Sequence, residues 1–225
     1  MEKTGIINSK DAQAVNFREI HMGNIAPNIL YRSSHPIKYL KQEKIISKLA
    51  ENAKVAAVLN LHDTKSGIVS KVFIAPWYNN LFKNNNVISL GMDFCVTGKN
   101  FQKKLKSALQ FIINTSGPWL IHCHAGVDRT GFVCMVLESF MGAVLDEVIN
   151  DYLLSFNSIF DSSIHEAAQI IDSFTALKIL SVMSDSKTID EKNLQQIAET
   201  YLRFTIGLSA EELELLRNKL SGNIK

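Results

Sequence analysis

The chain has few cysteines, and its charges are nearly balanced. An odd set of only three, Cys95, Cys123 and Cys134, is a poor basis for a disulfide framework. It suits a reducing compartment in which a thiol stays free. Lys and Arg number 24 against 22 Asp and Glu, so the formal net charge is only +2. The sequence lacks the concentrated basic face of a nucleic-acid-binding protein, and any preference for anions must therefore come from a local site.

Long uncharged runs are also missing. No uncharged stretch reaches the roughly 20 residues of a membrane-spanning helix, so we expect no integral membrane segment. The first residues, 1–5, lack the apolar segment of a signal peptide. We therefore expect a cytoplasmic protein, with secretion by another route or after removal of a signal peptide as the alternative. The residues carry no information on oligomeric state.

The pattern of apolar residues predicts an α/β fold. Hydrophobic residues make up 46% of the 225, ample for one packed domain over residues 1–225. Residues 1–28 show no clear period. Short apolar runs predict strands at 29–32, 55–61, 87–90 and 119–122. Amphipathic periods predict helices near Trp77 and at 37–52, 100–114, 130–142, 145–157, 164–183 and 190–204, with a last helix after the capping-box residue Ser209.

This alternation of strands and helices predicts a central, mostly parallel sheet flanked by helices. We expect the core of the domain to span about residues 15–156. Additional C-terminal helices, at about 160–220, are expected to pack on that core or to cap it.

The segment from His122 to Gly131 carries the strongest chemical signal. It reads H-C-x-x-G-x-x-R-T-G and follows a predicted strand at its carboxyl end, where parallel sheets bind ligands. Residues 123–129, here called the signature loop, can point backbone N–H groups inward at an anion. The helix expected from Thr130 adds its positive dipole end, and Gly126 permits a tight turn. The expected phosphate-binding residues are His124, Ala125, Gly126, Val127 and Thr130.

Two side chains of this segment supply the chemistry. Arg129 presents a planar fork of donors that fits two phosphate oxygens. The same positive field favours the thiolate of Cys123, which is a strong nucleophile. The hydroxyl of Thr130 can donate a hydrogen bond to the sulfur. The pattern predicts metal-independent hydrolysis of a phosphate monoester through a phosphocysteine, with Cys123 and Arg129 catalytic and no cofactor.

The segment resembles the signature loop of the cysteine-based protein tyrosine phosphatase superfamily. Upstream, Asn16-Phe17-Arg18-Glu19 and the later Ile29-Leu30-Tyr31-Arg32-Ser33-Ser34 resemble the N-terminal signature of one bacterial tyrosine phosphatase family. The resemblance covers about residues 15–156. Members of that family act on phosphotyrosine, and some act on phosphoinositides. The resemblance therefore implies a phosphorylated protein or peptide as substrate, with a phosphoinositide or inositol phosphate as the alternative.

One residue departs from the lipid-active members of that family. These often carry Lys before the Asp-Arg pair, giving G-K-D-R, and this chain has Val127 there. A cation that could meet an additional inositol phosphate is missing from the loop, so Val127 favours phosphotyrosine. A phosphate-binding module without turnover is a further alternative. It is expected to have lost Cys123 or Arg129, and both are present.

The leaving oxygen needs a proton, and three aspartates compete to supply it. Asp93 lies thirty residues before Cys123, after a predicted strand, and the superfamily commonly places its acid on such a loop. Asp128 lies inside the signature loop and resembles the Asp of G-K-D-R that has been proposed as the acid. Asp63 follows the buried strand at 55–61. We favour Asp93, then Asp128, and treat Asp63 as a supporting residue.

Other residues near the signal have simpler interpretations. His122 is expected to support the backbone and thiolate of Cys123. The His and Cys residues have no C-x-x-C or H-x-x-x-H spacing, so we predict no metal site. Cys134 is expected to be an inert core residue. Cys95 is either a small buried residue or a disulfide partner of Cys123 under oxidation, and Arg32 either lines the pocket or forms a salt bridge.

Overall fold

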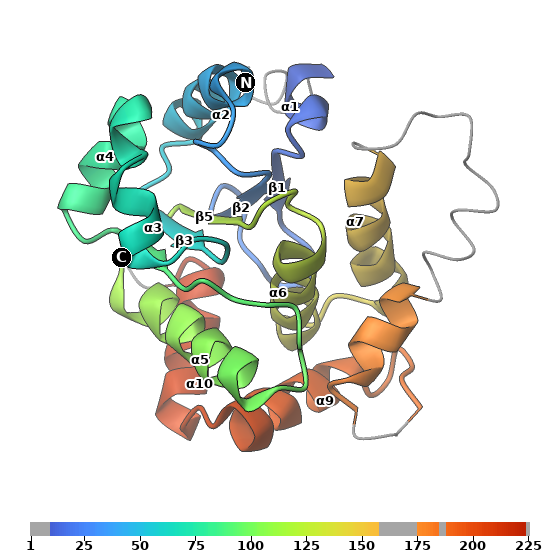
Figure 1. Ribbon diagram of the computed structural model, residues 1–225. Coiled ribbons are helices and arrows are strands. Elements are labelled where there is room, and N and C mark those ends of the chain that lie inside the picture. The colour runs from blue at the N-terminus through green and yellow to red at the C-terminus, as the bar shows by residue number, and fades with distance from the viewer. Residues whose placement is uncertain (1–9, 158–174, 185–187, 224–225) are drawn as a thin grey trace.

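A five-stranded sheet forms the centre of the molecule (Figure 1). The computed structural model describes residues 10–157, 175–184 and 188–223. The strand order is β1-β2-β5-β3-β4, and only β1 runs antiparallel to its neighbour. This arrangement confirms the predicted mostly parallel sheet. The strands are β1 (Arg18–Ile20), β2 (Leu30–Ser33), β3 (Ala57–Asn60), β4 (Val87–Ser89) and β5 (Trp119–His122).

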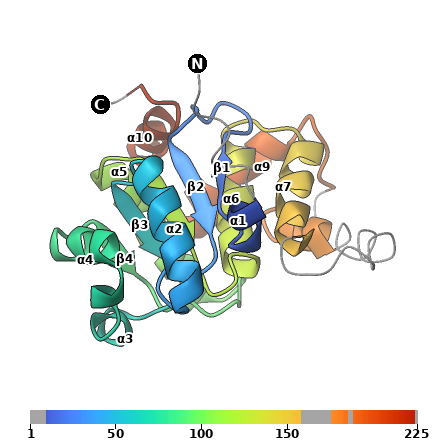
Figure 2. The same cartoon turned by 90° about the horizontal axis from the view of Figure 1, so that it is seen from above.

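Helices cover both faces of the sheet, as Figures 1 and 2 show. One face carries α1 (Lys10–Ala14), α2 (Leu40–Asn52), α3 (Lys65–Val69), η1 (Val72–Ile74) and α4 (Pro76–Lys83). The other carries α5 (Lys99–Asn114), α6 (Asp128–Phe140), α7 (Leu145–Asn157), α9 (Leu194–Thr200), η3 (Tyr201–Ile206) and α10 (Ala210–Leu220). Residues 175–181 are also helical.

The two faces explain the continuous apolar runs in the strands. In β5, Leu120 packs with the cluster around α2, and the next residue, Ile121, packs with the cluster around α5 and α6. Because successive side chains of a strand point to opposite faces, a strand covered on both sides must be apolar throughout. Helices α9 and α10 also contribute residues to the apolar cluster around α5 and α6 that contains Ile121 of β5.

The predicted elements agree with the structure except at several boundaries and in the segment before Trp77, where the structure adds α3 and η1. The last helix has the predicted capping box, in which Ser209 Oγ accepts from the Glu212 N–H and the Glu212 carboxylate accepts from the Ser209 N–H. The helix expected at 37–52 begins only at Leu40, and the one expected at 190–204 begins at Leu194 and ends as the π-helical η3. The stretch without a clear period contains α1 and β1. Most of the helix predicted at 164–183 lies outside the described residues.

Within the described parts of the chain, no helix has both the length and the apolar character needed to cross a membrane.

Candidate active site

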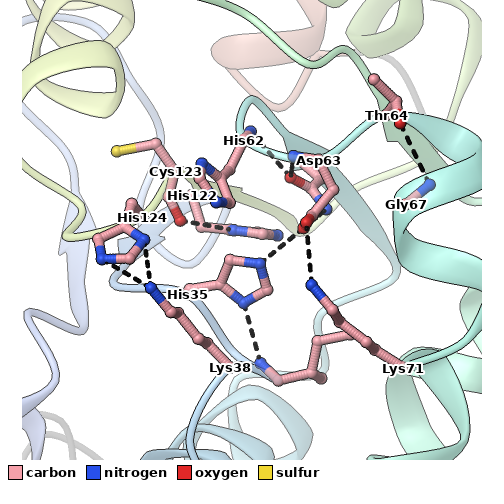
Figure 3. A network of polar contacts seen from close by, with 12 residues as sticks. His35, Lys38, His62, Asp63, Thr64, Gly67, Lys71, His122, Cys123 and His124 are labelled. Carbon is pink, nitrogen blue, oxygen red and sulfur yellow. Dashed lines mark hydrogen bonds and ion pairs between the residues drawn. The ribbon is translucent and has the colours of Figure 1, made fainter.

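The signature loop lies at the carboxyl edge of three adjacent parallel strands. The register pairs His122 at the end of β5 with Ser33 of β2 on one side and with Asn60 of β3 on the other. Residues that follow these strands therefore meet at one edge of the sheet. They include Cys123 and His124 from β5, His35 from β2, and His62 and Asp63 from β3 (Figure 3).

Contacts from β2 and the segment before β1 fix the backbone of the loop. The carbonyl oxygen of Gly126 accepts from Asn16 Nδ2 at 3.0 Å and from Arg32 Nη2 at 2.7 Å. The carbonyl of His124 accepts from the His35 N–H at 3.0 Å. Gly126 has a φ of +77°, and a β-carbon added there would lie 2.4 Å from the Ser33 carbonyl oxygen. The loop can pack this closely against β2 only because residue 126 is glycine.

Cys123 and Arg129 stand at the two ends of this loop. Cys123 is buried, and in Figure 3 its sulfur points away from His35 and Asp63. Arg129 is half-buried in the first turn of α6, and its Nη1 donates to the Met92 carbonyl oxygen at 2.9 Å. The same nitrogen lies 3.2 Å from His62 Nδ1. Within the described residues Nε and Nη2 of Arg129 have no protein partner, so two parallel donors remain for an anion.

The neutral ring of His62 matches this contact. Burial and the nearby Arg129 charge lower the pKa of His62 from 6.5 to about 4, although Asp63 acts in the opposite direction. The ring is therefore unprotonated near neutral pH, and its Nδ1 can accept the Arg129 hydrogen bond.

A buried network supports His122 next to the nucleophile. His122 Nδ1 lies 3.2 Å from the Cys123 carbonyl oxygen, and His122 Nε2 lies 3.2 Å from the Tyr78 hydroxyl. Asn60 Nδ2 donates to that hydroxyl at 3.2 Å and to Asp63 Oδ2 at 3.0 Å. Complete burial lowers the pKa of His122 well below its ordinary value, so the ring is neutral. These contacts hold the backbone at the start of the signature loop.

Asp63 is a charged anchor of this network. His35 Nδ1 accepts from the Ile37 N–H at 3.2 Å, so its Nε2 carries the hydrogen that is donated to Asp63 Oδ2 at 2.6 Å. Burial alone would raise the pKa of Asp63, but the hydrogen bonds from His35 and Asn60 outweigh it and hold that pKa well below its usual range. A carboxyl group that stays ionised cannot serve as the proton donor.

The other two aspartates are exposed. Asp93 follows β4, and its Oδ1 accepts from the Cys95 N–H at 3.2 Å. The residue before it, Met92, binds Arg129, so the loop that carries Asp93 lies against the signature loop. Asp128 is the first residue of α6.

The N-terminal signature supports the loop through buried charges. Arg18 Nε donates to Asp151 Oδ1 at 2.7 Å, and Arg32 Nη1 donates to Asp151 Oδ2. Arg32 and Asp151 are both completely buried. Of the two interpretations of Arg32, the structure therefore shows the salt bridge.

Three further predictions concern polar or sulfur side chains. Thr130 Oγ1 is buried and has no hydrogen-bond partner among the described residues. Burial raises the pKa of Cys134 to about 12, as an inert core thiol requires. Cys95 is a free, exposed thiol, so the interpretation as a small buried residue is wrong, because the loop after β4 lies at the surface.

Among described residues, no group of three or more His, Cys, Asp or Glu is arranged to hold a metal ion.

Four residues of the site, His35, Asn60, His62 and Tyr78, were not assigned a role from the sequence. His35 and His62 each follow a predicted strand at its carboxyl end, and this position is a signal that could have identified them. Tyr78 lies on α4, and nothing in its local sequence indicates that it contacts His122.

Residues 3–222 match the family described as a tyrosine phosphatase family. The chain belongs to this family. This match confirms the resemblance to the tyrosine phosphatases that the sequence motifs indicated. A comparison with curated proteins gives no match for this family member.

Two solved structures resemble this tyrosine phosphatase family member. One is the core catalytic domain of the PP-IP phosphatase SIW14 from S. cerevisiae, in complex with citrate. It is 22% identical with a TM-score of 0.44, and the match covers 82% of this chain and 91% of that chain. The other is the Siw14 catalytic core, which is 19% identical with a TM-score of 0.44 over 82% of this chain and 90% of that chain.

Proposed function

We propose that the chain hydrolyses phosphotyrosine through a phosphocysteine intermediate. The Cys123 thiolate attacks phosphorus, the bond from phosphorus to the leaving oxygen breaks, and Asp93 donates a proton to that oxygen. Water then attacks the phosphocysteine and gives a proton to the Asp93 carboxylate. The sulfur–phosphorus bond breaks, which releases inorganic phosphate and restores the thiolate.

The observation that carries this proposal is the geometry of residues 123–129. The loop joins the end of β5 to the start of α6, so the helix dipole adds to the backbone N–H groups at an anion. Arg129 is held through one nitrogen while its Nε and Nη2 have no partner in the described part of the protein. A guanidinium oriented in this way can bind two equatorial phosphate oxygens as charge spreads over them.

Asp93 is the acid that the surroundings favour. Asp63 is ionised and fully engaged with His35 and Asn60. Asp93 is exposed to an incoming substrate, and its loop is tied to Arg129 through Met92. Asp128 is also exposed and is the second candidate.

Phosphotyrosine is the substrate that the family and the aliphatic Val127 favour. A multiply phosphorylated inositol is a second candidate, because the structure places a different cation, Lys38, against His124 of the signature loop.

The test measures phosphate release without added metal from a phosphotyrosine peptide and from a phosphoinositide. Cys123→Ser is the control for the nucleophile. Release from the peptide that is abolished by Cys123→Ser supports the proposal. Preferred release from the lipid moves the substrate to the second candidate. If neither is cleaved but both bind, the loop only binds phosphate, and the proposed hydrolysis is wrong.

A further inference from the structure

The segment that leads to Asp93 is fixed at its backbone. Residues 90–92, here called the acid-loop stem, follow β4 and end just before Asp93. All three of their N–H groups donate to carbonyl oxygens of residues 60–63, at 2.8 or 2.9 Å. The carbonyl of Met92 accepts from Arg129 Nη1 at 2.9 Å. The stem therefore joins the end of β3 to the side chain that is proposed to hold the phosphate.

The carbonyl of Gly91, in the middle of the stem, has a partner on a helix. Gly91 has a φ of +52°, and a β-carbon added there would lie 2.7 Å from Thr64 Cγ2. The chain can turn this closely against Thr64 only with glycine at residue 91. Nζ of Lys104, from α5, donates to the Gly91 carbonyl oxygen at 2.7 Å. This bond ties the stem to α5.

Lys104 brings a positive charge to this contact. The side chain is half-buried, and none of the ion pairs among the described residues includes it. A hydrogen bond from an ammonium group to a carbonyl oxygen is stronger than one between neutral groups. Lys106, on the same helix, makes a bond of the same kind at 2.6 Å, but to the carbonyl of Gly207 between η3 and α10. The two lysines therefore form a matched pair, of which only Lys104 contacts the stem.

Asp93 depends on the stem for its place. Its side chain is exposed, and the hydrogen bond that its Oδ1 accepts from the Cys95 N–H, at 3.2 Å, lies within its own loop. That bond cannot fix the carboxylate relative to the phosphate site. The stem can, because it contacts Arg129 directly and Asp93 is the next residue.

We propose that Lys104 is a positioning residue, which holds the acid-loop stem and thereby places Asp93 beside the signature loop. The proposal rests on the proposed function, in which Asp93 gives its proton to the leaving oxygen. Lys104 acts through Gly91 rather than on the substrate. Without its bond the stem loses its tie to α5, and Asp93 can move relative to Arg129. Catalysis by a positioned group is sensitive to displacements of about 1 Å.

The test compares Lys104→Met with Lys106→Met. For Lys104→Met we expect kcat for a phosphotyrosine peptide to fall about 10-fold, because proton transfer is impaired. For an activated aryl phosphate, whose leaving group needs no proton, kcat should change about 2-fold or less. Lys104→Arg keeps a charged donor and should retain most of the activity. Lys106→Met should match wild type on both substrates. If Asp93→Asn lowers kcat but Lys104→Met does not, the inference is overturned and the proposed function stands.

A double variant shows whether the effect passes through Asp93. In the Asp93→Asn background, Lys104→Met should lower kcat no further, because the group that it positions is already gone. A second loss of about 10-fold in that background would mean that Lys104 acts through another residue, and the positioning of Asp93 would be wrong.

Amide hydrogen exchange gives a readout that needs no turnover. Lys104→Met should speed exchange of the stem N–H groups by about 10-fold, and Lys106→Met should leave it unchanged. If wild type releases no phosphate, the proposed function fails, and faster exchange in Lys104→Met still supports the hold on the stem. Exchange equal to wild type in Lys104→Met rejects the inference, whatever the activity.

Discussion

Arg32 on β2 donates a hydrogen bond to Asp151 on α7, and both side chains are completely buried. The second terminal nitrogen of Arg32, Nη2, donates to the carbonyl oxygen of Gly126. One guanidinium therefore joins α7 to the signature loop. The position of the loop depends on a charge pair whose members lie 119 residues apart in the sequence.

Removal of the carboxylate should be costly. In Asp151→Ala the charges of Arg18 and Arg32 remain buried without their partner, so we expect the free energy of unfolding to fall by about 3–5 kcal/mol. Urea denaturation measures this change. The matched control is Glu199→Ala, which removes the partner of Arg217 in a pair exposed to solvent and should cost about 0–1 kcal/mol. Similar losses in the two variants would show that burial does not make the Asp151 ion pair more costly to break than an exposed one.

Gly126 should tolerate no side chain. Its φ of +77° disfavours any β-carbon, and that carbon would lie 2.4 Å from the Ser33 carbonyl oxygen. We expect Gly126→Ala to displace the loop and lower phosphatase activity by about 100-fold or more, since misplacement by about 1 Å has effects of this size. Gly207→Ala is the control, because Gly207 has nearly the same φ, +81°, and an added β-carbon there would meet only Lys106 Nζ, at 3.9 Å. It should cost only about 1 kcal/mol of stability and leave activity unchanged. Equal activity in the two variants would contradict the role of close packing.

The general acid can be identified through the leaving group. Asp93→Asn should lower kcat for phosphotyrosine by about 100-fold, because the leaving oxygen then departs without a proton. The loss should be smaller for an activated aryl phosphate, whose leaving group needs no proton. Asp128→Asn is the paired measurement and should show no such dependence on the leaving group. The reverse pattern would assign the proton to Asp128.

The position of the loop between a strand and a helix could be predicted because its residues are local in sequence. Strand, glycine, arginine and helix follow one another within residues 119–131, and their order in the sequence is enough to indicate an anion-binding loop. The support of the loop could not be predicted in the same way. Tyr78 reaches His122 only through the packing of α4, and the interpretation of Arg32 stayed open because its partner lies on α7. β1 was missed because three residues are too few to show a strand period.

The neutral histidines make stability depend on pH. The pKa of His62 falls from 6.5 to about 4 on folding, so between these values the unfolded chain binds a proton that the folded chain does not. Stability should therefore decrease as the pH falls from 6.5 towards 4. The buried His122 acts in the same direction. In His62→Asn the loss over this window should be smaller than in wild type, whatever the stability at neutral pH. Denaturant unfolding at several pH values measures the slope, and an identical slope in the two proteins would show that His62 is protonated equally in both states.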